Sequence, residues 1–401
     1  MKLADITLRQ NRWMLWGTLA SLSAFQGFAT DIYLPSFTAV AKQFNVTTYD
    51  VQLTLSTFMF GMAIGQLVWG SISDRLGRKL PVNLGMILFI ASSIACAFAP
   101  NLTFLIIARF FQAFGGSAAL TSVRAIVRDL YTGEEMARTM SAIMSIFMAA
   151  PILAPSLGAL ILNFSSWNWI FIVLALFGII AFLNFSRFPE TLPIENRRQG
   201  NFAQAFKDYG SILKTPDFIF AGMQSLTTTA LLFTYVSLIP SVLMVEFNAT
   251  PTQFSIFFGV NALAIIAGSQ INRKILTKIK VDKALRNLLI FQVTMVAVLF
   301  AFAQTAPIIW VILPITMLIV GVNTSIGGNS ATLAMAPFQT KAAQASALVG
   351  VIQGIAGASV AAIAAVIPGE PLHKMTTMML TIALIAITVL AIRQRRIRRL
   401  A

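Results

Sequence analysis

Charged residues are scarce in this chain of 401 residues: they make up 11% of it, whereas hydrophobic residues make up 57%. An average soluble domain carries about 25% charged residues. Acidic residues are the scarcest charged type, with 14 Asp and Glu against 29 Lys and Arg. The mean hydropathy is +0.80. This composition excludes an ordinary water-soluble domain and predicts an integral membrane protein.

Chemically reactive side chains are almost missing as well. The single cysteine, Cys96, excludes a disulfide within the chain. The single histidine, His373, falls in an outer loop without a catalytic partner, and no nucleophile or cluster of metal ligands accompanies it. The phosphate-binding pattern GxxxxGK[ST] is absent, so nothing in the chain provides for ATP-driven work. We therefore expect no enzyme and no cofactor.

Long apolar runs, in contrast, are abundant. A helix needs about 20 apolar residues to cross a bilayer. Twelve stretches meet this requirement, at 13–38, 52–70, 81–99, 102–123, 139–163, 167–188, 218–243, 253–272, 285–304, 307–329, 344–367 and 373–392. The sequence thus predicts an all-α membrane protein with 12 transmembrane helices and both termini on one side.

Lysine and arginine residues gather at alternate ends of these spans. Of the 29, only Lys42 and Lys374 fall on one side of the membrane and only Arg109 falls deep in a span. The positive-inside bias places the opposite side, with both termini, in the cytoplasm. Because the positive charge is spread over every loop of that side, it suits contact with anionic membrane lipids and predicts no nucleic-acid partner.

The two halves of the chain repeat one pattern. A polar segment, 187–216, separates six spans from six. A shift of 198 residues, the difference between Phe60 and Phe258, also superimposes Gly61, Gly70, Ser71 and Arg75 on Gly259, Gly268, Ser269 and Arg273. We predict an N-terminal six-helix bundle at 1–188, a cytoplasmic linker at 189–216 and a C-terminal six-helix bundle at 217–401. Paired repeats with a site at their midplane interface are typical of alternating-access transporters.

The loop after the second span carries the most specific motif, GSISDRLGRK at residues 70–79. Gly70 permits a neighbouring helix to approach closely, and Gly77 suits a tight turn. Asp74 can cap the N-terminus of a neighbouring helix. The residue types of this loop therefore suit a junction between helices.

Basic residues of the same loop are candidates for conformational gating. Arg75 and Arg78 can reach carboxylates. Alternatively, these basic residues only enforce the topology. The ten-residue pattern resembles the loop signature of the major facilitator superfamily at every position, and Asp129, just after the fourth span, resembles the family's partner for such an arginine. The resemblance implies the major facilitator fold, with two pseudo-symmetric six-helix halves.

Further stretches narrow the resemblance. The segments TDIYLP, MAAPILAPSLGALI and FPETLP, together with residues 336–354, resemble the twelve-helix drug:proton antiporters of the bicyclomycin-resistance (Bcr/CflA) type. Ala113 and Ala150 stand where the family usually has glycine. The resemblance implies a monomer that exports small amphipathic molecules, with the proton as coupling ion. The alternative is a proton-coupled carrier of a dedicated metabolite, such as an amino acid or a siderophore.

Asp31 is the only carboxylate deep in a span, and Arg109 is the only such cation. At 1.5 Å per residue, Asp31 lies roughly 12 Å and Arg109 roughly 10 Å below the outer surface. A charge in hydrocarbon costs at least about 2.5 kcal/mol, so both side chains need the bundle interior or a wet cavity. We predict that Asp31 carries the proton, and that Arg109 or the arriving substrate displaces it. The alternative is a permanent ion pair that fixes the first span to the fourth.

Polar and aromatic residues at mid-span depth are the candidates for the substrate cavity: Tyr33, Gln112, Phe233, Tyr235, Asn261 and Gln353. Amides in membrane helices also serve as hydrogen bonds between helices, and aromatic rings also serve as packing. Pro151 and Pro155 remove helix hydrogen bonds in the fifth span. They predict either a helix that rocks or a rigid kink.

Overall fold

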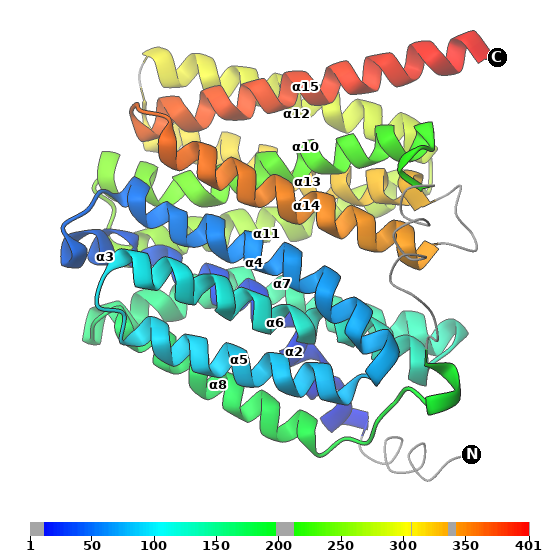
Figure 1. The fold of residues 1–401 in the computed structure, drawn as a ribbon. Coiled ribbons are helices and arrows are strands. Elements are labelled where there is room, and N and C mark those ends of the chain that lie inside the picture. The colour runs from blue at the N-terminus through cyan, green and yellow to red at the C-terminus, as the bar shows by residue number, and fades with distance from the viewer. Residues whose placement is uncertain (1–11, 198–211, 306, 336–341, 401) are drawn as a thin grey trace. The chain divides into compact units, whose positions relative to one another are not determined.

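A computed structural model describes residues 12–197, 212–305, 307–335 and 342–400 of the protein. Within these ranges the chain is almost entirely helical and has no strand (Figure 1). The long helices are α2 (Arg12–Asp31), α4 (Thr48–Leu76), α5 (Lys79–Ala97), α6 (Leu102–Leu130), α7 (Gly133–Phe164), α8 (Asn168–Ser186), α10 (Pro216–Ser241), α11 (Pro251–Leu276), α12 (Val281–Thr305), α13 (Ile309–Met335), α14 (Ala342–Val366) and α15 (Pro371–Leu400). The predicted all-α architecture is confirmed.

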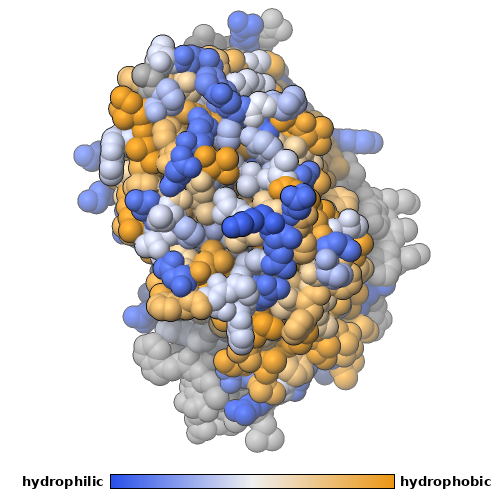
Figure 2. Space-filling view, turned by 90° about the vertical axis from the view of Figure 1, so that its left-hand side faces the viewer, coloured by the Kyte–Doolittle hydropathy of each residue, from blue (hydrophilic) through white to orange (hydrophobic). Residues whose placement is uncertain are grey.

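Length and apolar composition allow 11 of the described helices to cross a membrane. The remaining long helix, α2, contains a shorter apolar stretch, Leu15–Phe25. Large apolar side chains such as Phe164, Trp310 and Val366 are 84%, 72% and 78% exposed. Figure 2 looks onto the loop ends at the left of Figure 1, where hydrophilic side chains gather over the middle of the view and hydrophobic faces lie along its sides. Such faces are unfavourable in water and suit lipid, so the chain is a multi-pass membrane protein.

Two compact units divide the chain, Met1–Gly200 and Asn201–Ala401. Each contains six of the long helices. The division falls inside the segment 189–216, for which the sequence predicts a linker. The two units are described separately below.

Matched glycines pack the same pair of helices in each unit. In the N-terminal unit, a Cβ on Gly70 of α4 would lie 3.3 Å from the Thr121 side chain of α6. In the C-terminal unit, a Cβ on Gly268 of α11 would overlap the backbone of Gly321 in α13. The close helix approach predicted for Gly70 is therefore confirmed. The two units thus repeat each other in this helix packing as well as in their sequence.

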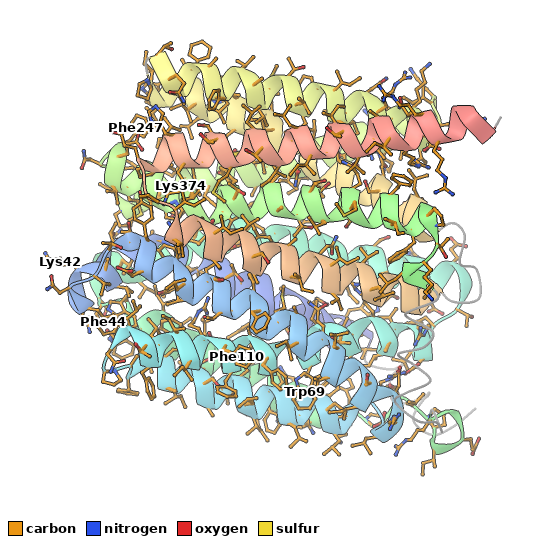
Figure 3. All side chains as sticks on the ribbon, turned by 45° about the horizontal axis from the view of Figure 1, so that its top comes forward. Lys42, Phe44, Trp69, Phe110, Phe247 and Lys374 are labelled. Atoms are coloured by element: carbon orange, nitrogen blue, oxygen red, sulfur yellow. The ribbon has the colours of Figure 1, made fainter. Side chains whose placement is uncertain are left out.

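A second repeated element opens α4 and α11. The stretch FNVT at 44–47 precedes α4, and FNAT at 247–250 precedes α11; Figure 3 labels the first residue of each, Phe44 and Phe247. The asparagines adopt the left-handed conformation, with φ of 52° and 53°. Each threonine then forms a capping box with the residue three positions later. The repeated FNxT pattern is visible in the sequence and could have predicted where both helices begin.

The first predicted span is not a continuous helix. After α2 ends at Asp31, a 3₁₀ turn, η1 (Leu34–Ser36), leads into α3 (Phe37–Phe44). The expectation of one helix over 13–38 is wrong, because Pro35 lacks a backbone donor and its ring crowds the carbonyl of Asp31, four residues earlier. Asp31 therefore lies at a helix end, where backbone carbonyls lack partners within the helix.

Prolines elsewhere have different effects on the helices. Pro151 and Pro155 lie inside α7, which remains helical from Gly133 to Phe164. Beyond Pro240, α10 passes into a π-helical turn, η3 (Val242–Glu246). Proline removes a helix hydrogen bond in each case, but only the surrounding packing decides whether the helix ends.

Candidate functional site

Arg109 occupies an aromatic cage inside the N-terminal unit. Its side chain projects from α6 and is fully buried. The guanidinium carbon lies 4.0 Å from the ring centre of Phe58, 4.9 Å from that of Tyr33 and 5.7 Å from that of Phe171. A cation over aromatic faces is stabilised by their negative electrostatic potential, more so where water is excluded. The cage thus replaces part of the hydration that burial removes.

Hydrogen bonds connect this cage to two neighbouring helices. Arg109 Nη1 donates to Gln112 Oε1 at 2.6 Å and to the carbonyl of Ala29, in the last turn of α2, at 3.3 Å. Gln112 in turn donates to Ser93 of α5 at 2.7 Å. A cation is favourable at a helix C-terminus, because the carbonyls there carry partial negative charge.

Gln112 and Tyr33, two of the residues predicted to line the substrate cavity, form contacts with neighbouring helices. Both ends of the Gln112 amide are bonded within the N-terminal unit. The hydroxyl of Tyr33 accepts a hydrogen bond from Thr54 at 3.2 Å, and its ring belongs to the Arg109 cage. For Gln112 and Tyr33 these contacts favour the alternative, packing between helices.

Asp31 and Arg109 lie close in depth but are not an ion pair. Asp31 is 8% exposed, and no salt bridge joins it to Arg109 in the described part of the chain. The alternative of a permanent ion pair is therefore wrong in this conformation. Nε and Nη2 of Arg109 are buried without a hydrogen-bond partner. The site thus holds a buried carboxyl group and a buried cation with spare donors.

Gly158 of α7 packs against the break that follows Asp31. A Cβ at this position would overlap the carbonyl oxygen of Ile32, and it would lie 3.2 Å from Pro35. The glycine lets the backbone of α7 touch the non-helical segment. It lies within the stretch MAAPILAPSLGALI, but the sequence offered no sign of its partner.

Charged side chains meet in the loop after α4. Arg78 donates from Nε to Asp129 at 2.8 Å and from Nη1 to Asp74 at 2.7 Å. The predicted pairing with Asp129 is confirmed, and enforcement of topology alone does not account for these contacts. Arg75 lies in the last turn of α4. The carboxylate that caps the neighbouring helix, α5, is not that of Asp74 but that of Glu190.

Glu190, in the segment after α8, binds the N-terminus of α5. Its carboxylate accepts hydrogen bonds from the backbone N–H groups of Arg78 at 2.7 Å and Lys79 at 3.0 Å. Gly77, with φ of 97°, makes the turn beside it, where a Cβ would overlap the carboxylate. The predicted tight turn is confirmed. Capping of α5 by Glu190, which lies in the stretch FPETLP, was not predicted from the sequence, although an acidic residue suits a helix N-terminus.

Glu190 should make the stability of the N-terminal unit depend on pH. Burial raises its pKa, but backbone N–H groups of Leu192, Arg78, Lys79 and Thr191 outweigh burial and hold the pKa below its ordinary value of 4.5. A lowered pKa stabilises the fold above about pH 4.5, and this contribution is lost as the pH falls through the lowered value.

We expect Glu190→Gln to lower the melting temperature of the purified protein at pH 7, because an amide presents one acceptor oxygen instead of two. A loss of about 1–2 kcal/mol corresponds to hydrogen bonds to a charged group. The melting difference from wild type should shrink at pH 4. Glu195→Gln, at an exposed position, is the matched control. Equal melting curves for wild type and Glu190→Gln at pH 7 would contradict this role.

The remaining cavity candidates lie in the C-terminal unit. Gln353 of α14 donates to Ser225 of α10 at 2.9 Å, and Phe233 packs against Gly357 of α14. Both contacts hold helices together. Tyr235 and Asn261 are different, since the Tyr235 hydroxyl and the Asn261 amide oxygen are buried without a hydrogen-bond partner.

Two six-helix repeats with buried ionisable groups in their spans have the architecture of a secondary membrane transporter. The chain belongs to the Major Facilitator Superfamily, whose sequence profile matches residues 19–367. This family consists of transporters and not of enzymes. The predicted family and the absence of an enzymatic role are confirmed.

Relatives extend the similarity over most of the chain. An MFS-type transporter of Bacillus subtilis (strain 168), YdgK, is 36% identical over 86% of this chain and 86% of its own. A bicyclomycin resistance protein homolog of Haemophilus influenzae is 32% identical over 85% of this chain and 86% of its own. A chloramphenicol resistance protein of Pseudomonas aeruginosa is 30% identical over 67% and 64%. The predicted resemblance to the bicyclomycin-resistance group is confirmed.

Solved structures share the fold at low sequence identity. A peptide transporter of the POT family in complex with sulfate has a TM-score of 0.77 at 14% identity, with 95% of this chain and 94% of that chain covered. A D-xylose–proton symporter has a TM-score of 0.73 at 13% identity, with 93% and 97% covered. At these identities the similarity concerns the fold alone.

Proposed function

We propose that this transporter exports small amphipathic molecules in exchange for protons by alternating access. The observation that carries the proposal is the buried carboxyl group of Asp31, which lies at the break after α2 without a salt bridge in the described residues. An ionised carboxylate without a counter-ion is costly where water is excluded. Water access at Asp31 therefore controls whether the group holds a proton.

The exchange follows from this dependence on water. When the cavity opens to the outside, Asp31 takes a proton; when it opens to the inside, the arriving substrate displaces the proton. The spare donors of Arg109 are available to an acceptor in the same region, whether the Asp31 carboxylate or an oxygen of the substrate. The names of the relatives, which refer to bicyclomycin and chloramphenicol resistance, support export of foreign compounds.

The remaining parts of the proposal concern setting and partners. We propose a bacterial inner membrane with both termini in the cytoplasm, because lysine and arginine concentrate on that side. The protein acts as a monomer, requires no cofactor, and uses the proton as its coupling ion. Membrane lipids and small amphipathic substrates are its partners.

Two measurements on wild-type protein test this function. In proteoliposomes with an imposed pH gradient, export of a labelled drug should be accompanied by proton movement in the opposite direction. In an efflux-deficient host, expression should raise resistance to several chemically unrelated toxins. Transport unaffected by the pH gradient would refute the antiport. Resistance to none of a broad panel would refute drug export and favour the carrier of a dedicated metabolite.

A further inference from the structure

Polar side chains inside the C-terminal unit commonly bond to one another. Gln292 of α12 donates to Asn323 of α13 at 2.9 Å, and Asn323 donates to the carbonyl of Thr228 in α10 at 3.0 Å. Tyr235 of α10 and Asn261 of α11 depart from this rule. Each is 2% exposed, yet the Tyr235 hydroxyl and the Asn261 amide oxygen lack hydrogen-bond partners. A buried polar atom without a partner is unfavourable, and in a native protein it points to a missing ligand or to water.

Tyr235 packs against Phe258, and Asn261 follows Phe258 by about one turn of α11. The Tyr235 ring stacks on Phe258 of α11, with centroids 6.1 Å apart and planes 20° apart. Phe258 and Asn261 are three residues apart in α11, so they share one helix face. One turn earlier, Phe254 extends the aromatic surface, with its centroid 5.7 Å from that of Phe258. An aromatic surface thus lies next to two side chains that each carry an unpartnered buried polar atom.

The orientation of the Asn261 amide is set by its backbone contact. Its Nδ2 donates to the carbonyl of Phe257 at 2.9 Å. Because a carbonyl only accepts hydrogen bonds, the nitrogen must face it, and Oδ1 is left as a pure acceptor. The Tyr235 hydroxyl can donate or accept. A complementary ligand thus offers an N–H or O–H group to Asn261 and an acceptor oxygen to Tyr235.

Charged side chains are absent from the middle of α10 and α11. The ionisable residues of α10 and α11 lie at helix ends: Asp217, Arg273 and Lys274. An ionised group beside Phe258 would lack a counter-ion from these two helices, and burial of an unpaired charge is strongly unfavourable. The surroundings therefore select against cationic and anionic ligand groups.

We propose that Tyr235, Phe258 and Asn261 form a substrate subsite for uncharged molecules that combine a hydrogen-bond donor, an acceptor oxygen and a flat apolar portion. Both polar atoms are covered in this conformation, so a ligand reaches them only when the protein opens. The subsite therefore rests on the alternating access of the proposed function, and it names the substrate class. A flat portion of the ligand packs against the edge of the aromatic cluster of Phe254, Phe258 and Tyr235, while the hydrogen bonds fix its orientation.

Equilibrium binding to the purified full-length protein in detergent tests the subsite. Chloramphenicol is the uncharged probe, because it carries an amide, hydroxyl groups and a nitrophenyl ring. Tetraphenylphosphonium is the cationic probe without hydrogen-bonding groups. Tyr235→Phe removes only the hydroxyl, and Asn261→Leu removes the amide at similar size. Asn287→Leu, at an exposed position of α12, is the matched control.

We expect each subsite variant to raise the Kd of chloramphenicol about tenfold, the effect of one lost hydrogen bond. The Kd of tetraphenylphosphonium should stay within about twofold in every variant, since that probe forms no hydrogen bonds. Wild-type protein that does not bind chloramphenicol would overturn the proposal, as would an unchanged chloramphenicol Kd in both variants. An equal loss for both probes would assign the two side chains to packing. Failure of the antiport is distinct, because it appears as drug transport that ignores a pH gradient while the binding results hold.

Discussion

Asp31→Asn is expected to reduce transport driven by a pH gradient to the level of protein-free liposomes. Asparagine has nearly the shape of a protonated aspartic acid, but it can neither take nor release a proton at the carboxyl position. The variant should therefore still bind substrate and exchange labelled for unlabelled substrate without a gradient. Proton-driven accumulation in proteoliposomes and gradient-free exchange are the two measurements.

The contrast between these two readouts separates coupling from folding. A misfolded variant loses both, whereas loss of a proton carrier removes only the accumulation. Asp282→Asn is the matched control, since its side chain is 59% exposed at the start of α12. Accumulation by Asp31→Asn at the wild-type rate would show that Asp31 takes no part in the coupling of transport to protons.

Replacement of Arg109 by lysine should lower transport more than tenfold even though the positive charge is retained. An ammonium group cannot lie flat over Phe58 and at the same time reach Gln112 and the carbonyl of Ala29, as the planar guanidinium does. The lost stacking and hydrogen bonding are worth about 2 kcal/mol together, which is more than tenfold in an equilibrium constant. The melting temperature should fall along with transport.

Arg128→Lys provides the matched comparison, because Arg128 lies on the same helix in an exposed position. Initial transport rates and melting curves of the two variants are measured side by side. If Arg109→Lys transports as well as Arg128→Lys, charge alone suffices at position 109. The cage would then have no part in positioning the end of α2.

Individual residues show where reasoning from sequence succeeded. Asp129 was correctly predicted as the partner of an arginine in the loop after α4, because its position resembles that of the family's partner residue; the structure shows that the arginine is Arg78. Asp31 and Arg109 were placed near the same depth, since rise per residue along a helix is constant. Their ion pair was not found, because depth says nothing about the direction in which each side chain points.

Other features of the structure could not be predicted from local sequence patterns. The helix is interrupted near Pro35, but Pro151 and Pro155 lie within a continuous helix, so the presence of proline alone does not predict a break. Glu190 and the N-terminus of α5 are more than a hundred positions apart. Their contact depends on how α8 packs against α5. Gly158 and Ile32 are likewise far apart in the sequence, and they meet because α7 packs against α2.

Eleven of the twelve predicted spans, their helical character and the distribution of basic residues among the loops could be read from the sequence alone. A bilayer demands that each crossing segment satisfy its own backbone groups, so local hydropathy suffices to identify it. The partners of Arg109 and Glu190, and the absence of a partner for Oδ1 of Asn261, emerged only from packing. Buried polar atoms find acceptors and donors on helices distant in sequence, and only the three-dimensional arrangement of those helices shows which atoms are paired and which remain open to a ligand.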